Sequence, residues 1–159
     1  MMNPTKPSFQ TFSDNKISLP NDWNTDKLGN LANVFSGGTP SRDHPEYYSG
    51  DIPWIKSGDL NQRYVSWTEE KITKEGLAKS SAKLIQPETL LMALYGATSG
   101  IVAIAKITAA INQAVLAIKP NLHILNNEFL FQFLEYARPQ ILAIYQQGGQ
   151  PNLSGEIVK

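Results

Sequence analysis

The chain of 159 residues carries 14 basic and 14 acidic side chains, so its formal net charge is zero, and 42% of its residues are hydrophobic. This composition suits one packed domain and argues against disorder, while the neutral charge argues against a chain that holds nucleic acid by itself. The absence of cysteine excludes disulfides, zinc–thiolate sites and thiol nucleophiles.

The first 19 residues are polar and rich in proline, and we predict a flexible arm over residues 1–19 followed by one domain over 20–159. The start of the chain has no apolar signal-peptide region, and no apolar run is long enough to span a bilayer. We therefore expect a cytoplasmic protein that is not associated with a membrane.

The first predicted elements follow this arm. Asn21 or Asp22 is expected to cap a short helical turn. Residues 31–36 (LANVFS) are expected to form a strand that runs into the turn Gly37-Gly38-Thr39-Pro40.

The stretch YYSGDIPWIKSGDL, residues 47–60, concentrates aromatic and turn-forming residues. Residues 51–57 predict a short strand, in which Pro53 indicates a sheet edge or a bulge. Further along, Thr68 is expected to cap a helix that Gly76 ends or interrupts.

Three apolar runs of strand length occupy residues 89–96, 101–107 and 114–120. The connections between them are too short for a parallel crossover. The pattern therefore predicts a buried antiparallel meander.

Residues 126–149 predict a helix that Asn126 or Asn127 caps and that Gly148-Gly149 ends. Pro139 is expected to divide or kink it, because proline lacks a backbone donor, and a further short helix is expected after Pro151. One face of the predicted helix carries Leu130, Phe133, Leu134, Ala137, Ile141, Ile144 and Tyr145. The elements together predict the α+β class: a single domain with a twisted, mostly antiparallel sheet or partial barrel and C-terminal helices.

Catalytic motifs are not evident. The loop GATSG has the wrong register for a nucleophile elbow, and no phosphate-binding glycine motif occurs. Asp59, Glu69 and Lys71 are the residue types of a metal-dependent nuclease, although Glu69 is better explained as a first-turn helix charge. We predict a binding protein without catalytic residues, metal or cofactor, and we treat His44 and His123 as solvated loop residues.

An ordered set of local features extends over residues 19–159: LPNDWNTDKLGNLANVFSGGTPSR, YYSGDIPWIKSGDL, KITKEGLAKSSAKLIQPETLL, YGATSGIVAIAK and INQAVLAIKP. No single piece is decisive, but their order is specific. The chain resembles a target recognition domain of the specificity subunit of type I restriction-modification enzymes.

This resemblance implies a non-catalytic role. A specificity subunit reads a split DNA sequence with two recognition domains, and helices dock modification subunits that bind S-adenosylmethionine and methylate adenine. A restriction subunit joins through the complex. The implied partners are double-stranded DNA, the modification and restriction subunits and a second recognition domain. The chain has one recognition domain and stops before the spacer helix, so we expect a half-subunit or an excised domain.

Part of the shared pattern is expected to be scaffold. Trp54 is interpreted as a core residue, with base stacking as the alternative. The amides of the Asn-Gln pair either brace neighbouring strands or face DNA. The predicted structural residues are Gly38, Thr39, Pro40, Trp54, Asn112 and Gln113.

Three polar segments are candidates for DNA contact: the loop 56–63, the hairpin end 95–100 and the helix end 146–150. Arginine can bond guanine, glutamine adenine and aspartate cytosine at the major-groove edge, and small residues let a backbone approach DNA closely. The alternatives are a solvated loop for the first segment and an ordinary turn for the second. The predicted DNA-binding residues are Lys56, Ser57, Gly58, Asp59, Gln62, Arg63, Lys79, Tyr95, Thr98, Ser99, Gln147 and Gln150.

The leading hypothesis is therefore sequence-specific DNA recognition that directs methylation and restriction by partner subunits. A non-DNA protein-interaction module derived from such a half-subunit is the alternative, followed by a metal-dependent nuclease. The nuclease hypothesis requires Asp59, Glu69 and Lys71 to converge.

Overall fold

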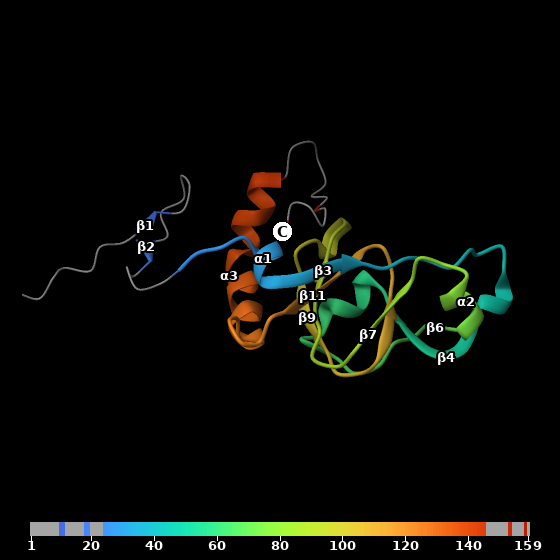
Figure 1. Cartoon of the computed structure of the whole chain (residues 1–159). Coiled ribbons are helices and arrows are strands. Elements are labelled where there is room, and N and C mark those ends of the chain that lie inside the picture. Colours follow the sequence, from blue (N-terminus) through green and yellow to red (C-terminus); the bar gives the residue numbers. More distant parts are fainter. Residues whose placement is uncertain (1–9, 12–17, 20–23, 146–152, 154–157, 159) are drawn as a thin grey trace, which may run out of the picture.

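The computed structural model describes residues 10–11, 18–19, 24–145, 153 and 158 (Figure 1). Its strands are β1 (Gln10–Thr11), β2 (Ser18–Leu19), β3 (Ala32–Ser36), β4 (Tyr48–Ile55), β5 (Tyr64–Val65), β6 (Lys71–Ile72), β7 (Lys83–Ile85), β8 (Leu90–Ala93), β9 (Val102–Ala105), β10 (Ala109–Ile111) and β11 (Val115–Pro120). Its helices are α1 (Leu28–Leu31), α2 (Lys74–Ala78) and α3 (Asn127–Tyr145), with 3-10 turns η1 (Pro45–Tyr47), η2 (Ser57–Asn61) and η3 (Gly96–Thr98).

A five-stranded sheet of order β3-β11-β8-β9-β5 lies at the centre of the domain. Alternate residues of its strands enter two different cores. Leu90 and Met92 of β8 pack with α3, while Leu91 and Ala93 pack toward the second sheet. Because both faces of the sheet are covered, its inner strands read as continuous apolar runs rather than as an alternating pattern.

The second sheet has four strands in the order β6-β4-β10-β7. Ile55, Ile85 and Ile111 from this sheet join the core that it shares with the five-stranded sheet. Its opposite face carries a smaller cluster around Trp54 and Ile72. Helix α2 packs on β4 at the end of the molecule away from α3 (Figure 1).

The predicted α+β class is confirmed, and most strand pairs are antiparallel; among the described pairs, β10–β4 and β5–β9 are parallel. The sheet is not one continuous meander. Strand β11 lies beside β8 and not beside β9. The reason is that residues 109–111, predicted to be a connection, form β10 of the other sheet.

The predicted helix capped by Thr68 is wrong. Thr68 is 7% exposed, and its hydroxyl donates to the backbone oxygen of Glu70, 2.8 Å away. Helix α2 begins later, where the hydroxyl of Thr73 accepts the Gly76 N–H at 3.0 Å. Gly76 lies inside α2, where it packs against the backbone of Tyr47 and does not end the helix.

The other helix boundaries are partly as predicted. Helix α1 starts after Lys27, whereas the predicted cap residues Asn21 and Asp22 lie outside the described residues. The side chain of Asn126 accepts the Phe129 N–H at 3.0 Å and caps α3. Helix α3 continues through Pro139 without being divided. The predicted end at 148–149, the short helix after Pro151 and most of the arm lie outside the described residues.

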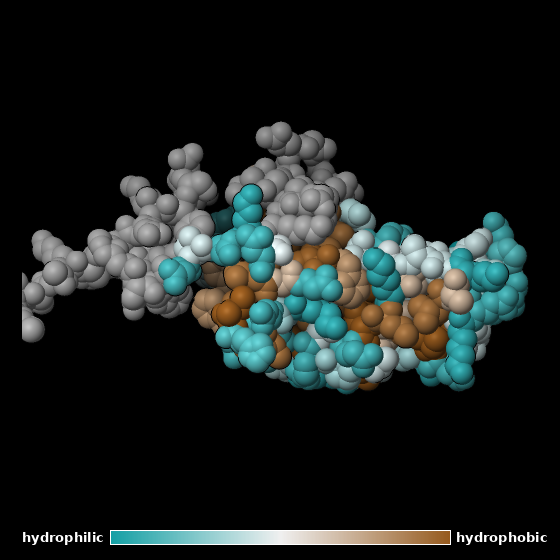
Figure 2. Space-filling model, viewed as in Figure 1, coloured by the Kyte–Doolittle hydropathy of each residue, from teal (hydrophilic) through white to brown (hydrophobic). Residues whose placement is uncertain are grey.

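The face of α3 that the apolar pattern selects is correct at most described positions. Leu130, Leu134 and Ala137 are buried. Phe133, however, is 45% exposed, and Phe131 takes the buried position at 0%. Figure 2 shows apolar side chains gathered on the surface over the N-terminal part of α3. No helix among the described residues is long and apolar enough to cross a membrane.

The turn at residues 37–40 crosses closely over the four-stranded sheet. The Gly37 N–H donates to the Asn112 oxygen at 3.2 Å, and the Gly38 N–H to the Ile111 oxygen at 3.1 Å. The indole N–H of Trp54, a 2% exposed residue, donates to the Gly38 oxygen at 3.3 Å. The register of β4 shifts between Tyr48 and Ile52, which is the irregularity expected near Pro53. The strand lies between β6 and β10, so it is not an edge strand.

Gly37→Ala should lower the free energy of unfolding by about 2–3 kcal/mol, because the added methyl group would push the turn at 37–40 away from β10. A methyl group at Gly37 would overlap the Ile111 carbonyl. The matched control is Gly58→Ala, since a methyl group at Gly58 would meet no atom within 4 Å. Urea unfolding of both variants checks this expectation, and equal stabilities would contradict it.

Candidate nucleic-acid interface

The first candidate segment, residues 56–63, is built around the 3-10 turn η2. Its Asp59 carboxylate accepts the Lys56 N–H at 2.8 Å, and Leu60 is 1% exposed and anchors the turn in the core. Asp59 therefore holds the turn together. Gly58 and Gln62 lie at the surface.

The second candidate segment is the end of the β8–β9 hairpin. Gly96 and Gly100 both have φ of 73°, a conformation that glycine adopts without strain. Tyr95 is 41% exposed, and the Thr98 hydroxyl donates to the Tyr95 oxygen at 3.3 Å. The prediction that Ser99 contacts DNA is wrong for this structure, because Ser99 is 1% exposed and its hydroxyl donates to the Leu94 oxygen at 3.1 Å.

These two segments lie against each other. Turn η2 contacts η3 and also packs on β8 and β9. Both segments touch α3 through arginine contacts: Arg63 reaches Glu128 and Glu135, and Arg138 reaches the Ser99 oxygen. The structure thus brings loop 56–63, hairpin end 95–100 and one helix together at a single place.

Arg63 does not extend freely from this surface. Its guanidinium lies 3.5 Å from a carboxylate oxygen of Glu128 and 3.5 Å from one of Glu135. The same group lies over the Phe131 ring, 4.1 Å from its centroid. The Arg63 backbone oxygen accepts the Ile104 N–H at 2.9 Å, which fixes the residue at the edge of the five-stranded sheet.

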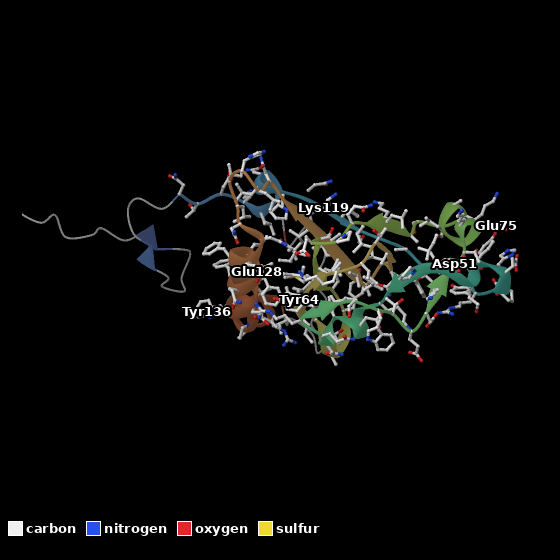
Figure 3. All side chains as sticks on the ribbon, turned by 90° about the horizontal axis from the view of Figure 1, so that it is seen from below. Asp51, Tyr64, Glu75, Lys119, Glu128 and Tyr136 are labelled. Atoms are coloured by element: carbon white, nitrogen blue, oxygen red, sulfur yellow. The ribbon has the colours of Figure 1, made fainter. Side chains whose placement is uncertain are left out.

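The predicted position Lys79 is not part of this cluster. Lys79 follows α2, whose Glu75 lies at the opposite end of the molecule from Glu128 (Figure 3). The third segment, with Gln147 and Gln150, lies outside the described residues.

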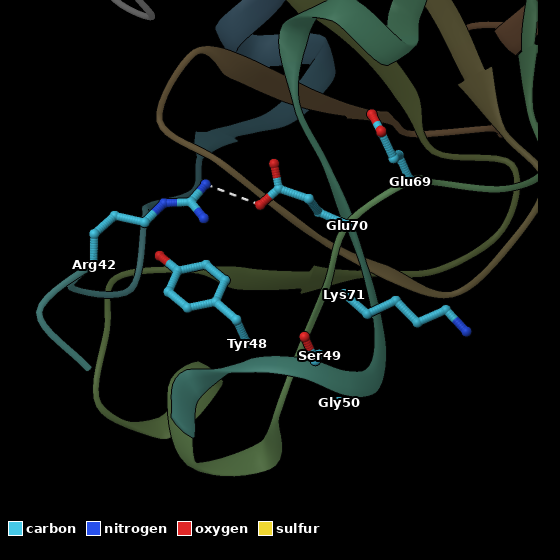
Figure 4. Close-up of a pocket in the computed structure, with 7 residues that line it drawn as sticks. All are labelled: Arg42, Tyr48, Ser49, Gly50, Glu69, Glu70 and Lys71. Carbon is cyan, nitrogen blue, oxygen red and sulfur yellow. Dashed lines mark hydrogen bonds and ion pairs between the residues drawn. The ribbon is translucent and has the colours of Figure 1, made fainter. Parts of the chain in front are cut away.

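Lys56 belongs to a second charged group that sequence reasoning missed. Glu70 bonds the Lys56 ammonium at 2.5 Å and the Arg42 guanidinium at 2.9 Å, on the wall of a shallow pocket (Figure 4). Arg42 also lies over the Tyr48 ring, 4.2 Å from its centroid. The hydrogen bond from Lys56 is the main cause that lowers the pKa of Glu70; burial opposes it, and Arg42 adds to it.

Burial of the Tyr48 ring raises the pKa of its hydroxyl, although the nearby Arg42 works against that shift. The Tyr48 hydroxyl donates to the Pro40 oxygen. This bond connects the turn at 37–40 to β4, so the residues that line the pocket hold that turn against the strand.

The Asn-Gln pair directly follows strand β10. Asn112 is 9% exposed, and its side-chain oxygen accepts the Ala114 N–H at 3.0 Å. Gln113 is exposed, and its side-chain oxygen accepts the Thr39 hydroxyl hydrogen bond at 2.5 Å. The Asn112 amide therefore shapes its own turn, and the Gln113 amide joins that turn to Thr39.

The residues of the nuclease hypothesis have other roles. Asp59 caps η2, while Glu69 and Lys71 line the pocket of Figure 4. No group of three histidine, cysteine or acidic residues among the described residues could hold a metal ion. Sequence reasoning also missed Trp67, which is 59% exposed beyond the short strand β5.

The domain consists of two sheets that share a core, with two polar segments side by side at its surface. Residues 20–159 match the family model of the type I restriction modification DNA specificity domain. The chain belongs to this family.

Two curated relatives support the assignment. The chain is 31% identical over 145 residues to the type I restriction enzyme MjaIX specificity subunit of Methanocaldococcus jannaschii, a match that covers 89% of this chain and 33% of the relative. It is 30% identical over 131 residues to the EcoR124I/EcoR124II specificity subunit of Escherichia coli, covering 78% of this chain and 32% of the relative. The chain thus spans about a third of the length of these relatives.

Solved structures show the same fold. A chain from a study of complex assembly and conformational transition of the type I R-M system superposes with a TM-score of 0.70 at 16% identity, covering 92% of this chain and 35% of that one. The HsdS subunit of Thermoanaerobacter tengcongensis superposes with a TM-score of 0.61 at 20% identity, covering 82% and 31%.

Glu70→Gln should lower the free energy of unfolding by about 1 kcal/mol at pH 7, the order expected for part-exposed ion pairs. The pKa of Glu70 is lowered in the folded state, so its contribution is full above the ordinary glutamate pKa and is lost as pH falls through the lowered value. Denaturant unfolding at pH 7 and pH 3 should show the difference shrinking in acid.

The exposed neighbour Glu69 supplies the control, since it shares the same loop. Glu69→Gln should change stability by less than about 0.5 kcal/mol at either pH. A Glu70→Gln deficit that persists undiminished at pH 3 would count against the ion-pair explanation.

Proposed function

We propose that this chain is a DNA sequence-recognition domain that acts as part of a type I restriction-modification specificity subunit, without a catalytic role of its own. One observation carries the proposal most directly: loop 56–63 and hairpin end 95–100, which are distant in sequence, lie together on one rigid core. Two adjacent polar segments at fixed separation are suited to reading consecutive base pairs.

We select the residues suited to base or phosphate contact by their exposure and by hydrogen-bonding groups that are not engaged within the protein. Gln62 and Tyr95 are exposed, and Gly58 leaves room for close backbone approach. Ser57 and Thr98 are half-buried beside them. The Lys56 ammonium donates a hydrogen bond to Glu70, so it can contact a phosphate only if that bond breaks.

The partners follow from family membership and charge. Zero formal net charge leaves little capacity to neutralise a DNA backbone, so a larger complex must supply most phosphate contacts. The proposed complex includes the modification subunit, which binds S-adenosylmethionine, a second recognition domain and, through the assembly, the restriction subunit. A cytoplasmic location fits these partners.

A second role, contact with another protein, is favoured by the surface of α3 and the loop before it. Leu122, Ile124 and Tyr136 are 71%, 61% and 64% exposed. Exposed apolar groups gathered on one face are typical of protein-binding surfaces. Figure 2 shows apolar surface over α3, so protein contact at this helix and DNA reading need not exclude each other.

The isolated chain should bind duplex DNA weakly, and its affinity should fall steeply as salt rises, because few phosphates are neutralised and those few contacts are screened. Adding the modification subunit should tighten binding. Fluorescence titration at low and moderate salt, with and without that subunit, measures both effects. Tight, sequence-specific binding that is equal in the two cases would contradict the proposal.

Gln62→Ala should relax the recognised sequence at one base pair, with a loss of about 1–3 kcal/mol of discrimination there. Mapping methylated adenines in a host that carries the chain with its modification subunit reads out the change. Gln86→Ala is the control: Gln86 is also exposed, but it precedes β8, whereas the hairpin end follows that strand. If the methylation sites were unchanged in Gln62→Ala, Gln62 would not be a base-contacting residue.

A further inference from the structure

We propose that Arg63 and Arg138 are positioning residues and that neither arginine reads a base itself. They hold loop 56–63 and hairpin end 95–100, here called the reading segments, against helix α3. The inference rests on the proposed function and assigns two roles within it. Its basis is a pair of contacts that run in opposite directions: Arg63 reaches from loop 56–63 to the helix, and Arg138 reaches from the helix to the hairpin end.

The Arg63 contact joins a side chain from the sheet edge to two positions of α3 that are about two helical turns apart. Glu128 and Glu135 each place a carboxylate oxygen 3.5 Å from a guanidinium nitrogen. Phe131, which is 0% exposed, presents its ring beneath the guanidinium between them. A planar cation held by two carboxylates and an aromatic face has a defined orientation.

The Arg138 contact holds the other segment. Its Nε donates to the backbone oxygen of Ser99 at 3.0 Å. Gly100 lies directly beneath the side chain, and a methyl group at Gly100 would come within 3.0 Å of Arg138 Cγ. The buried Ser99 hydroxyl and the left-handed Gly100 thus let the hairpin end approach the helix closely.

Helix α3 is a suitable anchor because it is itself fixed. Leu130, Phe131 and Leu134 are at most 4% exposed and pack on the five-stranded sheet. Both segments are therefore tied to one rigid element. Since a displacement of about 1 Å is enough to spoil a hydrogen-bonded site, the orientation set by α3 determines whether the segments can read bases together.

A base-reading role for Arg63 meets an electrostatic obstacle. To reach guanine, the guanidinium must leave both carboxylates, and Glu128 and Glu135 are 54% and 48% exposed. Two unpaired carboxylates would then lie beside the reading surface, where DNA phosphates repel them. Removing these carboxylates therefore separates the two roles: a base reader would be released and DNA affinity would rise, whereas a positioning residue would lose its anchor.

The test uses the full 159-residue chain with its modification subunit and a randomised double-stranded DNA library, followed by sequencing of the bound fraction. The variants are Arg63→Ala, Arg138→Ala and the double variant Glu128→Gln/Glu135→Gln. Lys106→Ala is the matched control, because Lys106 is a cation of the same sheet region that pairs with Glu88 at 2.7 Å and, although it is attracted by the charge of Glu128, forms no ion pair with Glu128 or Glu135. Thermal unfolding checks that each variant is folded.

We expect the ratio of specific to non-specific binding to fall at least about tenfold in all three variants, on the order of one mismatched base pair, with discrimination lost at several positions together. The double carboxylate variant should lose discrimination even though it becomes less acidic. Lys106→Ala should keep the recognised sequence and lose only a little overall affinity.

Two results would overturn the inference and leave the proposed function standing. One is a loss of discrimination at a single base pair in Arg63→Ala, and the other is unchanged or tighter specific binding in Glu128→Gln/Glu135→Gln. If Arg63→Ala does not fold, the carboxylate variant decides alone. Failure of the unmodified chain to enrich any sequence would overturn the proposed function and the inference with it.

Discussion

Burial of the five-stranded sheet on both of its faces is the constraint on which the rest of the structure depends. Residues of β8 alternate between the core under α3 and the core shared with the four-stranded sheet. Every residue of β8 and β9 is buried, so a polar side chain there would lose its hydration without compensation. Variation in polar side chains is therefore confined to the segments where these strands begin and end.

The two sheets and α3 then determine which of those segments meet. Strand β5 pairs with β9 at the sheet edge, which brings the end of η2 beside the hairpin that joins β8 to β9. Beside β10 of the four-stranded sheet, the glycine turn packs so closely that a side chain at Gly37 would overlap Ile111 and one at Gly38 would overlap Ser81. The close packing of this turn and the placement of the polar turn η2, which follows β4, are consequences of the same two-sheet arrangement.

The sequence predicts elements better than it predicts their neighbours. Long apolar runs indicate buried strands, and the i, i+4 spacing of Leu130 and Leu134 indicates the buried face of α3, because these patterns depend only on local periodicity. The partner of β11 could not be predicted, since the three-residue strand β10 is too short and small to be distinguished from a connection. Thr68 was misassigned because a threonine before acidic residues has the same sequence signature whether it caps a helix or bonds a loop backbone.

Site residues were harder to predict for an electrostatic reason. Arginine, lysine and aspartate in a polar loop have the right chemistry for base edges, but the same groups bond their own protein when a partner lies near. Arg63 meets Glu128 and Glu135, which are more than sixty positions away in sequence, and Lys56 meets Glu70. These ion pairs within the protein occupy the charged groups that the sequence predicts to contact DNA. What remains at the surface is neutral and hydrogen-bonding, and such a surface discriminates between bases more effectively than it attracts phosphates. Under the proposed function, specificity and affinity are therefore separate properties of this domain, and the affinity would come from the proteins assembled around it.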